Sequence, residues 1–222
     1  ELAIEWTYNS NAIEGNTLTL QETRLVLEQG ITIKGRKLRE HFEAKNHEKA
    51  IYFVEELARP KYVLNEKDIF GVHSLVLENI ESEFSGRYRN GQVRILGANF
   101  IPPNFVKVSS LMKELVAYTN DNPNKLSHVE LIARFHHKFV WVHPFFDGNG
   151  RTARLLMNLL FIKFGYPPAI ILKNNGKQYY RSLNQANKGD YKELILLIAQ
   201  ALERSLDFYL ESSGAMGTNE YI

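Results

Sequence analysis

The segment from His143 to Arg154, HPFFDGNGRTAR, collects side chains that can handle phosphates. His143 carries an imidazole with an ordinary pKa of about 6.5, so it can accept a proton at cellular pH. Asp147 offers the hard oxygen atoms that Mg²⁺ takes. Gly148 and Gly150 permit backbone angles at which successive N–H groups form a nest for an anion. Together these groups predict a site that binds a nucleoside triphosphate and moves one of its phosphoryl units.

The residues that follow the glycines are predicted to form a helix whose N-terminus points at this anion site. Apolar side chains within residues 151–164 supply one face of such a helix: Leu155, Leu156, Leu159, Leu160 and Ile162. Free N–H groups and the helix dipole favour negative charge at that end. Arg151 and Arg154 are three residues apart and share a face, so both guanidinium groups can fork onto phosphate oxygens.

Simpler interpretations exist for each part of the segment. A Gly-x-Gly is usually a turn, paired arginines on a helix are usually solvated, and a single histidine is usually structural. The proximity of His136, His137 and His143 also raises the possibility of zinc. The chain has no cysteine and the spacing is not His-Glu-x-x-His, so a zinc site is disfavoured. The whole combination of groups favours phosphate chemistry over a purely structural role.

The segment resembles the signature of the Fic family, His-Pro-Phe-x-Asp/Glu-Gly-Asn-Gly-Arg-x-x-Arg, at every defined position. The resemblance extends from about Ser10 to Phe208 and is closest to the self-inhibited members. It implies a mainly α-helical bundle with a short β-hairpin flap. It also implies an enzyme that transfers AMP from ATP to a hydroxyl group of a target protein, with Mg²⁺ as the metal.

The resemblance assigns a role to most residues of the signature. His143 would be the general base that deprotonates the target hydroxyl, and Asp147 would hold Mg²⁺ on the α- and β-phosphates. The anion hole and the outer-phosphate contacts would come from the rest of the ATP-binding set: Gly148, Asn149, Gly150, Arg151, Thr152 and Arg154. Gly150 is informative by itself, since kinase-like relatives carry Lys at this position and bind the nucleotide reversed.

A second segment, Ser10 to Asn16, reads SNAIEGN and resembles the family's inhibitory motif, Ser/Thr-x-x-x-Glu-Gly/Asn. Residues 2–13 can form a short helix that stops at Gly15, a residue common just beyond helix ends. The resemblance implies that Glu14 pairs with Arg154 and denies that arginine to the γ-phosphate of ATP. The alternative is an ordinary surface carboxylate. In some relatives the glutamate instead positions water for the removal of AMP, so both directions of the reaction stay open.

Residues 85–103 are predicted to form the flap. Asn90-Gly91 is a turn pair, residues 93–96 are β-like, and Pro102 and Pro103 exclude a helix. Composition alone favours an ordinary surface hairpin, whereas the resemblance implies a flap that docks the target protein by strand addition. The resemblance places Leu96, Gly97, Ala98 and Asn99 over the nucleotide. It places Tyr179, Tyr180 and Asn187 at the adenosine pocket, although an aromatic pair on a helix is usually core.

Composition narrows the class of protein. The chain has 222 residues, 44% of them hydrophobic and 23% charged, which fits one globular unit with a core. Its net charge of +2 is spread along the chain, so no nucleic-acid partner is expected. No apolar run reaches the roughly 20 residues that span a bilayer, and no signal peptide is visible. We therefore expect no membrane partner and a cytoplasmic location, which the lack of cysteine fits weakly.

Helix signals dominate the remaining pattern. A capping box of Thr19 and Glu22 opens a helix that ends near Gly30. Asn65 and Ser127 have side chains suited to capping two further helices. The helices are predicted near residues 2–13, 19–30, 38–57, 65–79, 107–120, 127–142, 151–164, 177–188 and 191–211. We divide the chain into an inhibitory helix segment (1–18), a Fic domain (19–211) and a C-terminal tail (212–222).

Two other functions stay open besides AMP transfer. One is a de-AMPylating phosphodiesterase that uses the same site. The other is a non-catalytic, ATP-sensing interaction module, which the intact His143 argues against because sensing needs no base. A homodimer is possible because relatives often form one.

Overall fold

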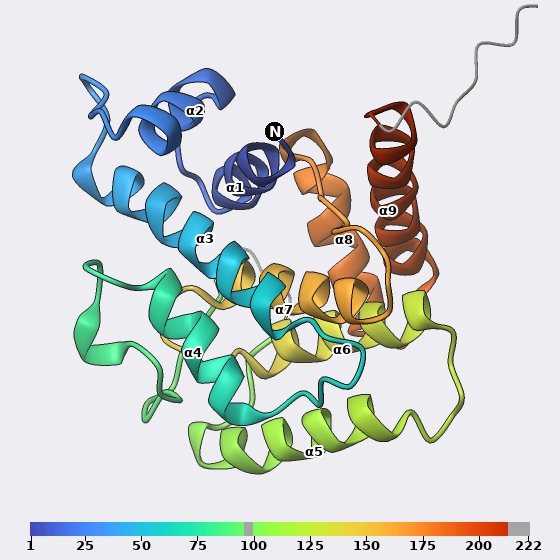
Figure 1. Ribbon diagram of the computed structural model, residues 1–222. Helices are drawn as coiled ribbons and strands as arrows, with labels where there is room; N and C mark the ends of the chain where they lie inside the picture. The colour runs from blue at the N-terminus through green and yellow to red at the C-terminus, as the bar shows by residue number, and fades with distance from the viewer. Residues whose placement is uncertain (96–99, 213–222) are drawn as a thin grey trace, which may run out of the picture.

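The structure, a computed structural model, describes residues 1–95 and 100–212 and is mainly helical in that part of the chain (Figure 1). The helices are α1 (Leu2–Ile13), α2 (Leu20–Gln29), α3 (Leu38–Leu57), α4 (Glu66–Val76), α5 (Val108–Asp121), α6 (His128–Val142), α7 (Asn149–Lys163), α8 (Gly176–Ala186) and α9 (Lys192–Ser212). Three short 3₁₀ turns complete the set: η1 (Ser82–Phe84), η2 (Phe105–Lys107) and η3 (Lys173–Asn175). The predicted helical fold is confirmed, with each helix end within about three residues of its expected position.

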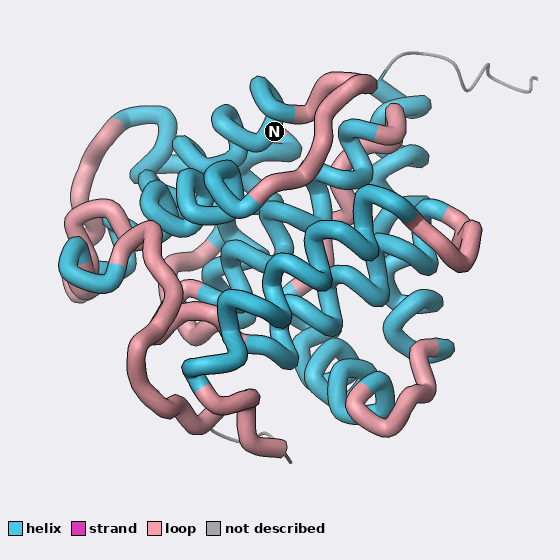
Figure 2. Tube along the Cα trace, turned by 90° about the horizontal axis from the view of Figure 1, so that it is seen from below, coloured by secondary structure: helices cyan, strands magenta, loops and turns pink. Residues whose placement is uncertain are grey.

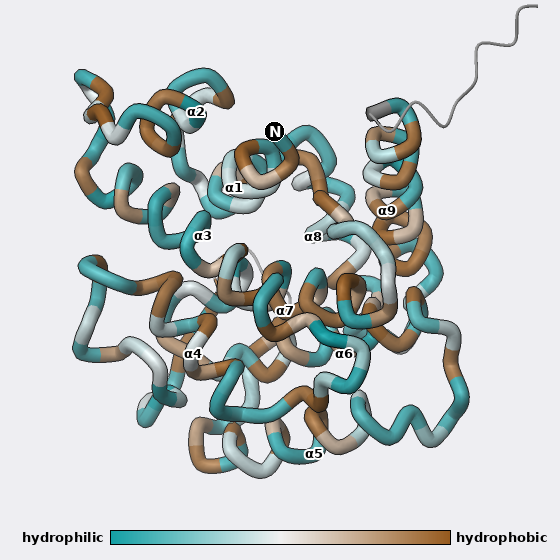
Figure 3. Tube along the Cα trace, viewed as in Figure 1, coloured by the Kyte–Doolittle hydropathy of each residue, from teal (hydrophilic) through white to brown (hydrophobic). Residues whose placement is uncertain are grey.

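Helix α7 lies at the centre and packs against α6, α3, α4 and α1 (Figure 1). Its residues are buried almost without a break from Asn149 to Phe161. Residues 155–161 are apolar except for Asn158, and a helical segment that is apolar on nearly all sides belongs in a core rather than at a surface. Figure 3 shows hydrophobic and hydrophilic residues alternating along the outer helices α3 and α9. The signature segment therefore lies at the end of the best-buried helix, which fixes its position.

Local capping signals set several helix boundaries. The Thr19 hydroxyl accepts from the Glu22 N–H at 3.1 Å, and the Thr19 N–H donates to the Glu22 carboxylate at 2.7 Å, so the predicted capping box is present. Asn65 caps α4 through the Asp68 N–H at 3.0 Å. Ser127 caps α6 through the Glu130 N–H at 3.3 Å. Each bond satisfies a helix N–H that would otherwise lack a partner.

The predicted β-hairpin flap is not seen among the described residues, where Figure 2 shows helices and loops only. Residues 85–95 and 100–104 form an irregular arm that contacts the signature loop, where the Arg89 N–H donates to the Pro144 carbonyl at 2.9 Å. The Gln92 side chain donates to the Pro102 carbonyl at 3.0 Å and ties the two sides of this arm together. Leu96, Gly97, Ala98 and Asn99 lie outside the described residues, as does the tail from residue 213. The hairpin therefore stays a prediction.

Candidate active site

The loop between α6 and α7 is held by its own asparagine and by two distant residues. The Asn149 amide accepts from the Phe145 N–H and donates to the Phe145 carbonyl, both at 2.9 Å. Gly148 precedes α7 in the left-handed region at φ 73°, where glycine avoids strain. The Asn149 side chain thus closes the loop. We expect a contribution of Asn149 to an anion hole from its backbone N–H, which lies at the first position of α7.

Two residues that the sequence analysis missed fix the ends of this loop. Arg89 is buried, and its side chain donates to the His143 carbonyl at 2.8 Å and the Gly91 carbonyl at 2.9 Å. The ring of His73 stacks on Phe145 at 3.6 Å between centroids, and its Nε2 lies 3.1 Å from the Asp147 carbonyl. Neither residue sits in the signature, so only their contacts across the fold identify them.

His143 lies at the C-terminal end of α6 with φ 49°, which is uncommon for a residue other than glycine. Burial lowers the pKa of His143 to about 4 and outweighs the carboxylates of Glu14 and Asp147, which raise it. Its Nδ1 is buried, and its side chain lines a cavity together with Glu14 and Gly150. The imidazole is therefore neutral at pH 7 and free to accept a proton.

Asp147 is surrounded by positive groups. Its Oδ1 accepts from the Gly148 N–H at 2.6 Å and lies 3.6 Å from Arg151 Nη2. Its Oδ2 forms an ion pair with Arg39 of α3. Burial raises the pKa of Asp147, but Arg151, the Gly148 N–H and Arg39 outweigh it and hold that pKa below its usual range. The carboxylate is ionised, as a metal ligand must be.

Arg151 and Arg154 are both buried, and each has N–H groups without a hydrogen-bond acceptor. In Arg151 these are Nε and Nη1, although Nη1 lies 3.3 Å from Glu43 Oε1. In Arg154 the open donor is Nη1. The Thr152 hydroxyl is likewise buried without a partner. Buried charged donors that lack acceptors are costly, so this cluster is suited to receive an anion with many oxygen atoms.

Glu14 reaches this cluster from the end of α1. Its Oε1 accepts from Arg154 Nη2 at 2.8 Å, and Arg154 also donates to the carbonyl and hydroxyl of Ser10 at 2.8 and 3.0 Å. A Cβ placed on Gly150 would overlap Glu14 Oε1 and lie 2.8 Å from Glu14 Cδ. The carboxylate therefore rests against the glycine nest. The predicted contact between Glu14 and Arg154 is present in the structure.

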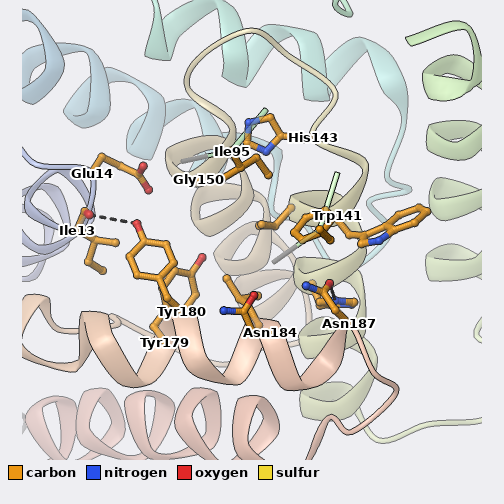
Figure 4. A pocket seen from close by; sticks show the side chains of 14 residues that line it. Ile13, Glu14, Ile95, Trp141, His143, Gly150, Tyr179, Tyr180, Asn184 and Asn187 are labelled. Carbon is orange, nitrogen blue, oxygen red and sulfur yellow. Dashed lines mark hydrogen bonds between the residues drawn. The ribbon is translucent and has the colours of Figure 1, made fainter. Parts of the chain in front are cut away.

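A cavity of about 500 Å³ opens beside Glu14, Gly150 and His143 (Figure 4). Its walls are mostly apolar and include Ile13, Ile95, Phe100, Val140, Trp141 and Leu183. Polar groups enter at a few points, among them Asn187 at the end away from Glu14 (Figure 4). A largely apolar cavity with a few polar groups is typical of a small-molecule site.

The two predicted pocket tyrosines occupy different positions. Tyr179 is buried, and its hydroxyl lies 2.9 Å from His136 Nε2, so it belongs to the core as well as to the pocket wall. Tyr180 is partly exposed and donates to the Ile13 carbonyl at 3.2 Å (Figure 4). Asn187 lies 2.9 Å from His137 Nε2. The structure therefore brings Tyr179, Tyr180 and Asn187 to one pocket.

Fold and site together define a helical domain in which two buried arginines, Arg151 and Arg154, form an anion-binding site beside an apolar pocket. The Fic/DOC family model matches residues 63–161. Over 95% of its length the chain is 39% identical to "Protein adenylyltransferase Fic" of Drosophila mojavensis, of which it covers 42%. These findings show that the chain belongs to the Fic family.

Solved structures agree with this assignment. The fold matches Fic-1 (residues 134–508) from C. elegans with a TM-score of 0.87 and 35% identity, covering 97% of this chain and 64% of that one. It matches a Fic-domain signalling protein from Bacteroides thetaiotaomicron with a TM-score of 0.90 and 27% identity, covering 100% and 90%. The chain spans about half or less of the curated relatives it matches.

No helix in the described part of the chain is both long and apolar enough to cross a bilayer.

Proposed function

We propose that this chain transfers AMP from ATP to a hydroxyl side chain of a target protein and is held inactive by Glu14. The main support for this proposal is a pair of buried arginines, Arg151 and Arg154, at the N-terminal end of α7. Both have N–H groups that lack a hydrogen-bond acceptor. Glu14 is the anion that meets Arg154 in the structure, in a position where a terminal phosphate would make the same contact. The relatives named as adenylyltransferases support this choice of chemistry.

The proposed transfer step uses these groups as follows. The target hydroxyl oxygen forms a bond to the α-phosphorus, the bond from that phosphorus to the α–β bridging oxygen breaks, and pyrophosphate leaves with the electron pair. His143 takes the hydroxyl proton on its neutral imidazole. The backbone N–H groups of Asn149 and Gly150 and the two arginines would stabilise the negative charge that develops on the phosphates, whereas the Gly148 N–H is taken up by Asp147.

Asp147 fits the role of a Mg²⁺ ligand. It is ionised and partly exposed beside the anion-binding site. No group of three His, Cys, Asp or Glu side chains converges within the described residues, so oxygens of the nucleotide and water would complete the metal shell. Mg²⁺ bound there would neutralise charge on the phosphates. The adenine and ribose would occupy the apolar cavity between Tyr180 and Asn187.

We assign target docking to the arm formed by residues 85–95 and 100–104. The exposed apolar side chains of Ile101, Phe105 and Val106 lie along or next to it. A target segment that adds to this arm as a strand would bring its hydroxyl toward His143. Homodimer formation remains a prediction for size-exclusion measurements.

The test is transfer of radiolabelled AMP from [α-³²P]ATP to proteins of a cell lysate. Two proteins are compared: the Glu14→Ala variant, in which the inhibition is released, and the same variant with His143→Ala added. We expect labelling to disappear with His143→Ala while binding of ATP and the thermal midpoint persist. Labelling that survives this substitution would show that His143 is not the base.

Removal of AMP is the second candidate, because Glu14 and His143 line the same cavity (Figure 4). In that reaction Glu14 would orient a water molecule toward the modified side chain. Incubation of an AMP-modified protein with wild type and Glu14→Ala separates the two reactions. Loss of AMP release in the variant supports removal, whereas a gain of transfer in the same variant supports inhibition. An ATP-sensing module would bind ATP and do neither.

A further inference from the structure

Arg39 occupies the oxygen of Asp147 that a metal ion would need. The two residues are 108 positions apart, and the pairing forms because α3 packs across the N-terminal end of α7. The other carboxylate oxygen of Asp147 already accepts from the Gly148 N–H and faces Arg151. Both oxygens are thus engaged by positive groups of the chain itself.

Arg39 is also bound to two other carboxylates. Its Nε donates to Glu43 Oε1 at 3.2 Å, and its Nη1 lies 3.3 Å from Glu81 Oε1. One guanidinium therefore bridges three carboxylates that come from α3, from the segment after α4 and from the signature loop. If Arg39 moves away from Asp147, it keeps its ion pairs with Glu43 and Glu81, so its positive charge stays paired.

The exposure of the pair makes such an exchange feasible. The Arg39 side chain is 46% exposed and the Asp147 side chain 35%. Ion pairs at this level of exposure are weak and are easily replaced. By contrast, the Arg151 side chain is only 3% exposed and stays fixed beside Asp147. Of the two arginines, Arg39 is the one able to move away from the carboxylate.

We propose that Arg39 is an exchangeable counter-ion that holds the metal position on Asp147 until Mg²⁺ arrives with the nucleotide. The inference rests on the proposed function. A guanidinium and a divalent cation repel each other, so each weakens the binding of the other to Asp147 Oδ2. Arg39 competes with the metal, and it therefore sets the Mg²⁺ concentration at which nucleotide binding is strengthened.

The test measures the affinity for α,β-methylene-ATP by calorimetry, first in EDTA and then at a series of fixed free Mg²⁺ concentrations. The parent protein carries Glu14→Ala, which leaves the anion site free for phosphate. The test variant carries Arg39→Met in addition. Methionine keeps an aliphatic chain and removes the charge. Arg24→Met is the matched control, since Arg24 is a partly exposed arginine on α2 that pairs with Glu1.

We expect Mg²⁺ to improve nucleotide affinity two- to fivefold more in Arg39→Met than in the parent, which is about the effect of losing one exposed ion pair. Arg24→Met should match the parent, and Arg39→Lys should lie between the two. A Mg²⁺ effect that is unchanged or smaller in Arg39→Met overturns the inference. Arg39 would then be a structural partner of Asp147, or would hold it in place for the metal.

Failure of the inference is distinguishable from failure of the proposed function. If Glu14→Ala binds no nucleotide under any condition, the proposed function itself is wrong. Nucleotide binding with no response to Mg²⁺ leaves the ATP site standing but overturns the role of Arg39, because there is no metal to displace. Arg39→Gln serves as a second charge-removing variant if Arg39→Met does not fold.

Discussion

Replacing Glu14 with alanine should make the protein less stable and at the same time a better nucleotide binder. Arg154 would lose one charge-assisted hydrogen bond of 2.8 Å and keep its two bonds to Ser10. A hydrogen bond to a charged group is worth about 1.5–3 kcal/mol. The Glu14 side chain is 34% exposed, so solvent screening puts the loss near the lower end, at ~1.5 kcal/mol.

The same quantity sets the expected gain in affinity. A phosphate group can reach Arg154 and the Gly150 nest only after Glu14 leaves. Since about 1.4 kcal/mol corresponds to a tenfold change in an equilibrium constant, we expect roughly tenfold tighter ATP binding in Glu14→Ala. Labelling of lysate proteins from [α-³²P]ATP should rise by at least a similar factor. The thermal midpoint without nucleotide should fall by about 3–6 °C for a domain of this size.

Calorimetry with ATP, a thermal melt and labelling from [α-³²P]ATP measure the three quantities on the same preparation. Glu5→Ala is the matched control, because Glu5 lies on the same helix and has no place in the pocket. Equal ATP affinity and equal labelling in wild type and Glu14→Ala would refute inhibition by Glu14. A fall in stability without any gain in affinity would mean that the pair with Arg154 is purely structural.

Other predictions concern the buried histidines and the residues that support the loop. Burial lowers the pKa of His73 to about 4 and of His136 to about 3, and lowers that of His47 well below its usual value. These rings take up protons only on unfolding, so the free energy of unfolding should fall as the pH drops below about 6.5. The fall is up to ~1.4 kcal/mol per pH unit for each ring and continues down to the pKa of the folded state. Thermal melts measure this, and a flat profile between pH 6.5 and 5 would contradict the burial argument. Arg89→Met removes donors from buried carbonyls and should cost about 2–3 kcal/mol in denaturant unfolding, with a larger loss of labelling than the stability change explains; normal labelling would deny it a role in placing His143. Asn149→Ala should cost a similar ~2–3 kcal/mol, because two buried backbone groups of the loop lose their partner, and a change below 0.5 kcal/mol would show that water replaces the amide.

The helices could be predicted because their signals are local. The capping box at Thr19 and Glu22 and the cap at Ser127 act within a few residues, so the sequence contains the whole interaction. Boundaries shifted by up to about three residues because the last turn depends on packing. The flap was different. Its turn residues predict a hairpin, but a strand is defined by its pairing, and no pairing occurs among the residues that the structure describes.

The sequence by itself also predicted which groups of the signature lie together, because His143, Asp147 and the two glycines fall within eight positions of one loop. The contact between Glu14 and Arg154 was predicted only through the family resemblance. Their separation of 140 residues gives no local signal, and packing of α1 against α7 creates the contact.

The tertiary structure alone decided which distant side chains support the site. Arg39 reaches Asp147 across 108 residues, Arg89 caps the end of α6, and His73 stacks on the signature loop. In the sequence each of these residues looks like an ordinary surface or core residue. Their roles arise because burying the apolar face of α7 forces three other segments against its N-terminal end, where unpaired polar groups must find partners.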